Sequence, residues 1–421
     1  MPGDEKKDRT VTLFGAREAV RSFGDNVSMP YVPFYLTRLN ATLSQMGVFQ
    51  ALQSLLPNIF QLPWGYISDR LGRRVPFIVA GAVLASMTLI FATFVSDVTL
   101  LIMIFSLNAV ALSIMIPTTS ALLGDKIKHG ERGRGLSKIL NFALVAGILG
   151  NISVLVYFTL FSSTDVDVFR TLLVVGAVFG LVSVVFIIPI KDKGSSKVKH
   201  RFVTWSKLCP EFRYFVKAQV IYNFFMSFAW PVFYITMAYV LGASNMEIAI
   251  STLIGVVATI AFQPLVGRVL DKAGPVGLII VSRFVFVIVP FAYGFANAMW
   301  QIYVLNLVLG VGMAIINVAF TAYILDMSTE ETKAEHFSYH NLAVGVAGFA
   351  GSLIGGFMAN YLQSIWPLAT ALLIVYVASG FGRLAAANMY FDMRDSQRYP
   401  TTTRQIANEY ITRLRIFLYR Q

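Results

Sequence analysis

Long apolar stretches recur along this chain about a dozen times, with short polar turns between them. The hydrocarbon layer of a bilayer is about 30 Å thick, and an α-helix crosses it with roughly 20 apolar residues. A soluble protein would carry more charge than the 13% found here, against 56% hydrophobic residues in a chain of 421. The pattern therefore predicts an all-α protein that crosses a membrane many times.

Twelve transmembrane helices are predicted from the positions of the apolar stretches. They cover residues 17–38, 46–67, 76–96, 99–123, 136–161, 170–190, 213–241, 246–267, 275–296, 299–325, 337–361 and 366–388. Because twelve is an even number, both ends of the chain are expected on the same side of the membrane.

Lysine and arginine divide unevenly between the two sides of this arrangement. Cytoplasmic loops collect these residues, and the outer loops would hold only Arg38 and Arg170. We therefore expect a multi-pass protein of the cell membrane with cytoplasmic N- and C-termini. The same loops account for the net charge of +12, so the lipid bilayer, and not nucleic acid, is the expected partner. The polar segment before residue 13 lacks the apolar core of a signal peptide, so the first span would act as its own signal.

A charged turn with the letters GYISDRLGRR, at residues 65–74, separates the second and third predicted spans. Its glycines permit a tight reversal, and its charges fall where a helix would leave the bilayer. This turn, here called the signature loop, resembles the G-x-x-x-D-R-x-G-R-R signature of the major facilitator superfamily. The matching residues are Gly65, Asp69, Arg70, Gly72, Arg73 and Arg74.

An internal repeat supports a division of the chain into two halves. Polar residues of the signature loop region recur 202 positions later: Gln61, Gly65 and Asp69 correspond to Gln263, Gly267 and Asp271. Asp125 and Asp326 also hold similar places after the fourth and tenth spans. We predict an N-terminal bundle (1–190), a cytoplasmic linker (191–212), a C-terminal bundle (213–390) and a cytoplasmic tail with an amphipathic helix (391–421). Two pseudo-symmetric six-helix bundles are a transporter architecture.

The resemblance implies a gate at the signature loop. Asp69 would face the start of the eleventh helix near His336, where the helix dipole favours an anion, and Arg73 would pair with Asp125. The resemblance implies that both contacts form in the outward-open state and break when the protein opens inward. The second copy, with Gly267, Asp271 and Asp326, lacks the arginines and would form a weaker gate. The alternative is that these charges only set the topology.

The first span is the most polar, and Glu18, Arg21 and Asp25 share one of its faces. A carboxylate within a span is a functional candidate by default, and Asp25 could reach a central cavity. Removal from water favours its neutral form, which suits a group that binds and releases protons. Neighbouring Asn26 is a further candidate for the proton or substrate site. The alternative is that Asp25 and Arg21 form a structural ion pair.

Other polar or aromatic residues within spans could line a cavity. In the superfamily that the signature loop resembles, spans one, four, seven and ten line it, which favours Tyr31, Asn108, Asn223, Trp230, Asn306 and Asn317. For each of them, ordinary hydrogen bonding or packing between helices is the competing role. Arg283 is expected to extend its charged end toward the cytoplasmic side of span nine.

The sequence contains no Walker loop, no H-E-x-x-H pair and no dinucleotide fingerprint, and Cys209 is its only cysteine. We therefore expect no enzymatic activity, cofactor or metal. The expected function is a monomeric secondary active transporter that exports a small, partly apolar solute, with H+ as the coupled ion.

Two alternatives remain for the function: a proton-coupled importer of a polar metabolite, such as a sugar, amino acid or organic acid, and a non-transporting receptor or lipid-handling protein. The drug:H+ antiporter branch of the superfamily carries a Gly-Pro pair in span five and an arginine in span four. Here Asn151 follows Gly150, and residues 107–110 read LNAV, so both motifs are absent.

Overall fold

The computed structural model describes the chain except for residues 1, 127–131, 162–165, 191–204, 330–331 and 395–421. The side chains of 2–10, 69, 124–126, 132–137, 272–273 and 334 also lie outside the description. The long helices are α1 (Pro2–Ser28), α3 (Leu43–Leu71), α4 (Val75–Thr93), α5 (Val98–Lys126), α6 (Arg132–Leu160), α7 (Val166–Ile187), α8 (Pro210–Phe228), α10 (Asn245–Ala273), α11 (Pro275–Gly294), α12 (Met299–Ile315), α14 (Lys333–Gln363) and α15 (Leu368–Asn388).

Short helical turns extend or join these helices. The first span continues from α1 through η1 (Met29–Tyr31) into α2 (Val32–Arg38), and others are η3 (Trp205–Lys207), α9 (Trp230–Ile235), α13 (Thr321–Asp326) and η6 (Met389–Asp392). Two turns, η4 (Thr236–Val240) and η5 (Ile316–Phe320), are π-helical. All regular elements of the described residues are therefore helical.

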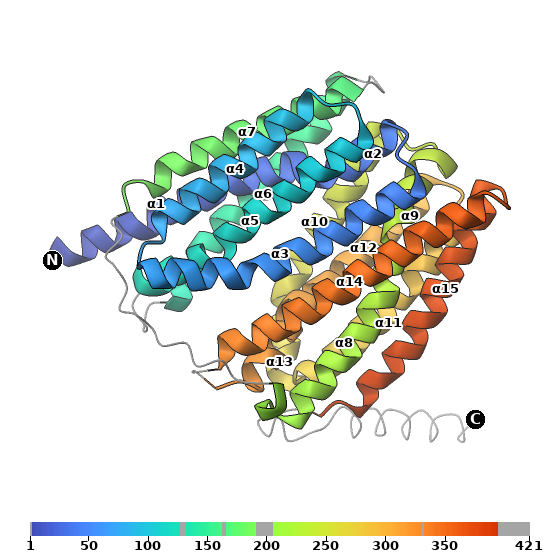
Figure 1. The fold of residues 1–421 in the computed structure, drawn as a ribbon. Coiled ribbons are helices and arrows are strands. Elements are labelled where there is room, and N and C mark those ends of the chain that lie inside the picture. The colour runs from blue at the N-terminus through green and yellow to red at the C-terminus, as the bar shows by residue number, and fades with distance from the viewer. Residues whose placement is uncertain (1, 127–131, 162–165, 191–204, 330–331, 395–421) are drawn as a thin grey trace.

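Ten of the described helices are long and apolar enough to cross a membrane. The polar helices α1 and α3 are not among the ten, yet they run among the other helices in Figure 1 and complete the twelve predicted spans. Most helix ends fall within a few residues of the prediction. The largest difference is the start of α1, at Pro2 instead of residue 17, and α8 begins at Pro210, inside the predicted linker. The predicted tail helix lies outside the described residues.

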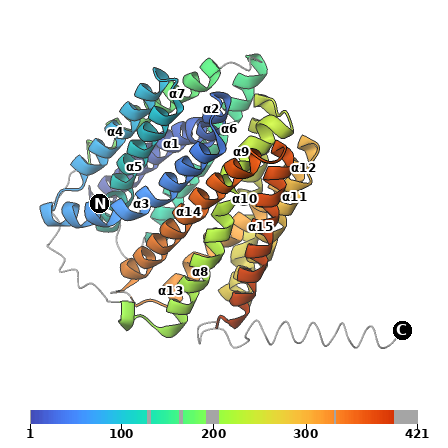
Figure 2. The ribbon, with the colours of Figure 1, turned by 45° about the vertical axis from the view of Figure 1, so that its right-hand side comes forward.

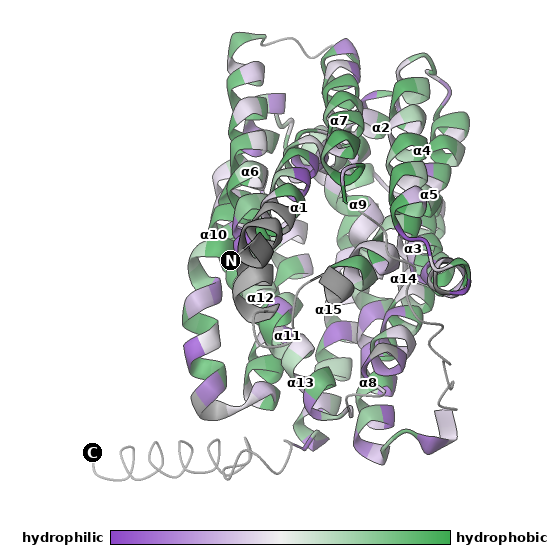
Figure 3. Cartoon of the chain, turned by 90° about the vertical axis from the view of Figure 1, so that its left-hand side faces the viewer, coloured by the Kyte–Doolittle hydropathy of each residue, from purple (hydrophilic) through white to green (hydrophobic). Residues whose placement is uncertain are grey.

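The helices form two bundles with the same internal arrangement. In the first bundle α1 lies between α6 and α7, and α5 lies between α3 and α4; in the second, α8 lies between α14 and α15, and α12 lies between α10 and α11. Across the bundles α3 runs along α14, as Figures 1 and 2 show, and α6 contacts α10. Figure 3 shows apolar residues over much of the length of helices such as α4, α6 and α7, as expected of helices that face lipid.

The two bundles also repeat their local backbone chemistry at the predicted spacing of 202 residues. Helix α3 begins with a capping box between Thr42 and Gln45, and α10 begins with one between Ser244 and Glu247. The first of these helices is followed by Gly72 with φ 62°, the second by Gly274 with φ 76°; a left-handed φ suits glycine best. Equivalent helices thus start and stop by the same means.

Removal of one of these caps should lower stability by a small and defined amount. The Ser244 hydroxyl accepts a hydrogen bond from the Glu247 backbone N–H at 3.2 Å. Ser244→Ala is expected to lower the free energy of unfolding by about 1 kcal/mol, measured by unfolding in mixed micelles with increasing SDS. Ser244→Asp keeps an acceptor and should restore most of the loss. Equal stability of the alanine variant and the wild type would contradict the assigned cap.

Candidate functional site

The two bundles are joined at the end of the molecule opposite the signature loop, here called the far end. The Arg38 guanidinium donates to the Ala243 carbonyl at 2.8 Å, and the Tyr239 hydroxyl donates to the Thr37 carbonyl at 2.6 Å. The rings of Phe34 and Tyr234 meet edge to face at 5.1 Å. Residues from α2 and from α9–η4 therefore close the space between the bundles at the far end.

Helices α3 and α14 continue this contact toward the signature loop. A Cβ placed on Gly47 would lie 2.8 Å from the Gly356 Cα, and one on Gly345 would lie 2.9 Å from the Asn58 Cβ. Beyond Asn58, α3 becomes more exposed, and Tyr66 reaches 54%. Among the described residues, the contacts named here join the bundles from the far end to about Asn58.

Two of the arginines of the signature loop are exposed. Arg70 and Arg73 are exposed, Gly72 is half-buried, and Arg74 is buried. Gly65 lies close to α5, because a Cβ added there would be 3.6 Å from the Pro117 Cβ. The side chains of Asp69 and Asp125 lie outside the described residues, so the pairing of Arg73 with Asp125 stays a prediction.

The second copy of the loop is less closely packed than the first. A Cβ added to Gly267 would meet open space. Asp271 is exposed, and Asp326 at the end of α13 is half-buried. The weaker second gate also stays a prediction.

The charged residues of α1 form one connected cluster. Arg21 Nε lies 3.2 Å from Asp25 Oδ2, so these two residues form the ion pair that the sequence offered as the alternative to a proton or substrate site. Glu18 lies between two arginines: it accepts a hydrogen bond from Arg17, and its other oxygen is 3.9 Å from Arg21. Arg17 is fully buried and also donates to the Thr119 hydroxyl at 3.3 Å. The cluster thus links α1 to α5.

Asp25 is accessible although it lies deep in the first span. Its side chain keeps 41% of its surface accessible, against 22% for Arg21. Both residues also line a small cavity of about 20 Å³ within the first bundle, with Ser86, Asn108 and Ser183 on other walls. A space of this size holds about one water molecule. Asp25 therefore combines a partner cation with room for solvent.

Three of the candidate asparagines bind neighbouring helices of their own bundle. The Asn26 oxygen accepts from Asn151 on α6 at 3.0 Å. Asn108 donates to the Ala85 carbonyl on α4 at 2.9 Å, and Asn306 donates to the Ser251 hydroxyl on α10 at 2.6 Å. These bonds match the competing role that the sequence left open, and a cavity role for the three residues stays a prediction.

The other cavity candidates occupy different settings. Tyr31 is buried with its ring edge against Phe158, and Asn223 donates to the Gln219 carbonyl one turn back at 2.8 Å. Trp230 is half-buried at the start of α9, whereas Asn317 is exposed on η5. The described residues do not bring these four into one cluster with Asp25.

The second bundle holds two buried arginines that the sequence did not reveal as such. The expectation that Arg283 extends to the membrane surface is wrong: it is 2% exposed. Its guanidinium lies 4.5 Å from the ring centroids of Tyr222 and Phe320, and 5.5 Å from that of Tyr390. Aromatic faces attract the cation, so the side chain turns inward.

Arg383, which falls within the predicted twelfth span (366–388), is 1% exposed within α15. It donates to the Phe286 carbonyl at 2.8 Å and to the Met226 carbonyl at 2.9 Å, and so joins α15 to α11 and α8. Ser379, one turn earlier, accepts from the Arg383 Nε at 3.1 Å. The serine four residues before Arg383 was the one feature of the local sequence that could have indicated a buried arginine.

Arg383→Ala should destabilise the second bundle strongly. The change removes three charge-assisted hydrogen bonds and leaves a cavity, so we expect a loss of about 3 kcal/mol in the free energy of unfolding. Unfolding of the purified protein in mixed micelles measures this loss. Arg394→Ala is the control, since Arg394 is exposed, and it should leave stability nearly unchanged. Similar stabilities for the two variants would contradict the role given to Arg383.

Comparison with known proteins gives consistent relatives. An uncharacterised MFS-type transporter of Methanocaldococcus jannaschii is 22% identical over 382 residues, which is 88% of this chain and 92% of that protein. The multi-drug resistance efflux pump PmrA of Streptococcus pneumoniae is 22% identical over 80% of this chain and 86% of its own. The multidrug resistance protein MdtG of Klebsiella pneumoniae is 22% identical, with 90% and 93% covered.

Solved structures share the fold. The nucleoside transporter NupG superposes with a TM-score of 0.70 at 12% identity, over 90% of this chain and 99% of that one. A bacterial homolog of the human lysosomal transporter Spinster, inward-facing and occupied, gives a TM-score of 0.65 at 13% identity, over 92% and 96%.

The family model described as Major Facilitator Superfamily matches residues 18–234 and 218–421, and so covers both bundles. Its members are transporters and not enzymes, in agreement with the relatives above. With two matching bundles, an intact signature loop and this match along nearly the whole chain, the protein belongs to the major facilitator superfamily.

Proposed function

We propose that this protein is a secondary active transporter that exports small, partly apolar solutes in exchange for protons. The bundles, residues 1–190 and 213–390, would rock about a shared site between them, linked by residues 191–212. The chain would act as a monomer in the cell membrane, with both termini and the tail from residue 391 in the cytoplasm. This is the alternating access expected of two-bundle transporters.

The relatives support the direction and the solute class of this proposal. PmrA is named a multi-drug resistance efflux pump, and MdtG a multidrug resistance protein. The spans of this chain are rich in aromatic residues, at 14% of the chain, and sites for partly apolar solutes are lined mainly by apolar and aromatic side chains with few polar anchors.

The setting of Asp25 is the observation that carries the proposal. A carboxylate in the middle of a span is costly and marks ion or proton pathways. Asp25 has its cation partner on its own helix, and 41% of its side chain is accessible. A proton on Asp25 would weaken the bond to Arg21 without disturbing the contacts between bundles. The carboxyl group can therefore exchange protons and leave the fold intact.

The contacts at the far end support a two-state cycle. Arg38, Tyr239 and Phe34 close that end in the present conformation, and the exposed Arg73 lies at the other end. To open toward the far end, the protein would break these contacts and close the signature loop against the second bundle. Two states of similar free energy could then be biased by solute and proton.

The proposal is tested with purified protein in liposomes under an imposed pH gradient, with a panel of labelled lipophilic cations and neutral aromatic compounds. We expect at least one compound to move against its gradient while protons move the opposite way. Movement of a sugar, amino acid or organic acid together with protons would favour the importer. Proton movement that no compound alters would count against both transporters.

A further inference from the structure

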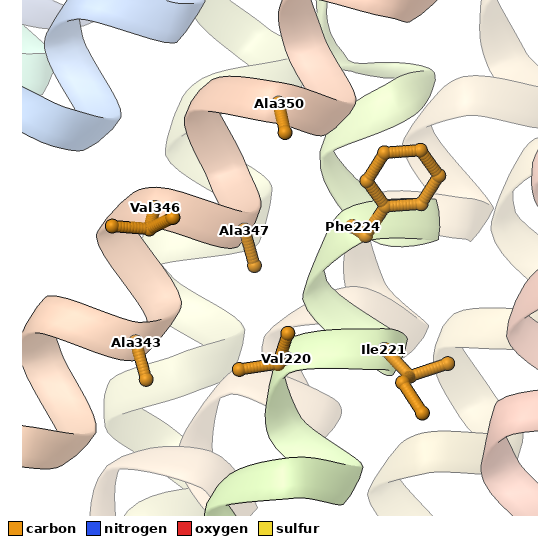
Figure 4. A pocket seen from close by; sticks show the side chains of 7 residues that line it. All are labelled: Val220, Ile221, Phe224, Ala343, Val346, Ala347 and Ala350. Atoms are coloured by element: carbon orange, nitrogen blue, oxygen red, sulfur yellow. The ribbon is translucent and has the colours of Figure 1, made fainter.

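An apolar groove of about 460 Å³ lies between α8 and α14 in the second bundle. Figure 4 shows its walls: Val220, Ile221 and Phe224 from α8, and Ala343, Val346, Ala347 and Ala350 from α14. All of these residues lie within helices that are apolar enough to span a membrane. We propose that this groove is a binding site for one anionic phospholipid, with an acyl chain between the two helices.

The groove exists because the two helices touch at one level and part below it. A Cβ added to Gly351 would lie 2.1 Å from the Phe224 carbonyl oxygen, and one on Gly355 would lie 1.9 Å from that of Phe228. Only glycine permits so close an approach of backbones. Toward the signature loop, alanines at 343, 347 and 350 leave the space between the helices unfilled.

The groove opens on the outer side of the bundle. Val220 is 37% exposed, Ile221 42% and Val346 49%. The inner side of α8 is the opposite one, where Phe215 and Tyr222 are fully buried. On α14, Gly345 and Gly348 face α3 instead. Lipid is therefore the medium at the mouth of the groove, and an acyl chain is the ligand that matches an apolar lining at this depth.

Two cations mark where the headgroup would lie. Arg213 and Lys217 precede Val220, Ile221 and Phe224 at helical spacing, so they share the groove face of α8 toward its N-terminal end. Lys217 is exposed, and Arg213 Nε has no hydrogen-bond acceptor among the described residues. Within that part of the chain neither forms an ion pair. A phosphate group at the membrane surface would supply the negative charge that pairs with them.

Aromatic residues at the same level fit a membrane–water boundary. Tyr339 lies one turn before Ala343 on the groove face of α14, and its ring centroid is 5.6 Å from that of Trp205. Tyrosine and tryptophan gather where headgroups lie. Cations, aromatic rings and apolar groove thus follow one another in the order of headgroup, boundary and acyl chain.

Mass spectrometry of the intact protein, released from detergent after titration with phosphatidylglycerol or phosphatidylcholine, tests the site. We expect one tightly retained phosphatidylglycerol. Arg213→Gln and Lys217→Gln should each weaken its retention about fivefold and leave that of phosphatidylcholine unchanged. Val346→Trp should fill the groove and reduce retention of both lipids.

The matched control is Ile354→Trp, because Ile354 is also 49% exposed on α14 but lies beyond the groove. It should retain lipid like the wild type. If Val346→Trp fails to fold, Ile221→Trp on the opposite wall serves instead.

Equal lipid retention by the groove variant and the control would overturn the site. A preference for phosphatidylglycerol that remains after both Arg213→Gln and Lys217→Gln would overturn it as well. A dimer mass without lipid would show a second copy to be the occupant. None of these readouts depends on the proposed transport.

Discussion

Asp25→Asn should reduce proton-driven solute accumulation in liposomes to background, while the protein still inserts and folds. The amide keeps the size of the side chain and leaves an oxygen near Arg21, whose Nε lies 3.2 Å from the carboxylate, but it cannot bind and release a proton. Movement of solute down its own gradient should persist, because that movement needs no coupled ion. Solute and proton fluxes measured in the same vesicles separate the two effects.

Two further variants make this prediction specific. Asp25→Glu keeps a titratable group and should retain part of the coupled transport. Asp167→Asn removes another carboxylate of an ion pair in the same bundle, since Asp167 lies 2.8 Å from Arg170 but is 81% exposed. It should transport like the wild type. Proton-coupled accumulation by the Asp25→Asn protein would exclude Asp25 as the coupling group.

Asp69→Asn should abolish transport without lowering the amount of protein in the membrane. By the family pattern, Asp69 would bind the start of α14 only when the signature end closes, so its loss should remove one of the two states that the cycle needs. Present contacts between α3 and α14 reach from Gly47 to about Asn58 and do not require the loop. Folding and insertion should therefore survive, and both are measured by gel filtration and membrane fractionation.

The equivalent residue of the second bundle gives the matched comparison. Asp271 lies 202 positions after Asp69, is exposed, and has no arginines after the following glycine. Asp271→Asn should lower the transport rate less than Asp69→Asn does. If Asp69→Asn and Asp271→Asn both transported at the wild-type rate, the gate would be contradicted, and the charges of the signature loop would only set the topology.

Much of the fold could be predicted because a bilayer imposes one simple requirement on a spanning helix, a stretch of roughly 20 apolar residues. Apolar length alone located α4, α5 and α15 to within a few residues, and the shared offset of Gly65 and Gly267 indicated the two bundles. The start of α1 at Pro2 was missed because hydropathy detects the apolar part of a helix and not its polar extension. Helix formation outside the hydrocarbon layer leaves no such signal.

Only some contacts of the candidate site could be predicted from the sequence, for a different physical reason. The Arg21–Asp25 pair follows from spacing on one helix, since both partners lie within four residues. The partners of Arg283 and Arg383 are rings and carbonyls on other helices, and every helix offers carbonyls. Sequence position near a span end therefore suggested exposure, whereas packing placed both cations inside.

The π turn η5, at Ile316–Phe320, changes which residues of the tenth span lie on the same face of the helix. Eleven residues separate Asn306 from Asn317, and a helical wheel with 3.6 residues per turn places them on one face. A π turn takes up about one residue more than an α turn. Residues after the turn are therefore rotated about the helix axis relative to the positions that a regular helical wheel gives them. Asn306 bonds to α10, and Asn317, at the start of the turn, is exposed, so the two residues already differ in their surroundings before the shift takes effect. Spin labels or cross-linkers placed on either side of this turn by wheel position would report on two different walls.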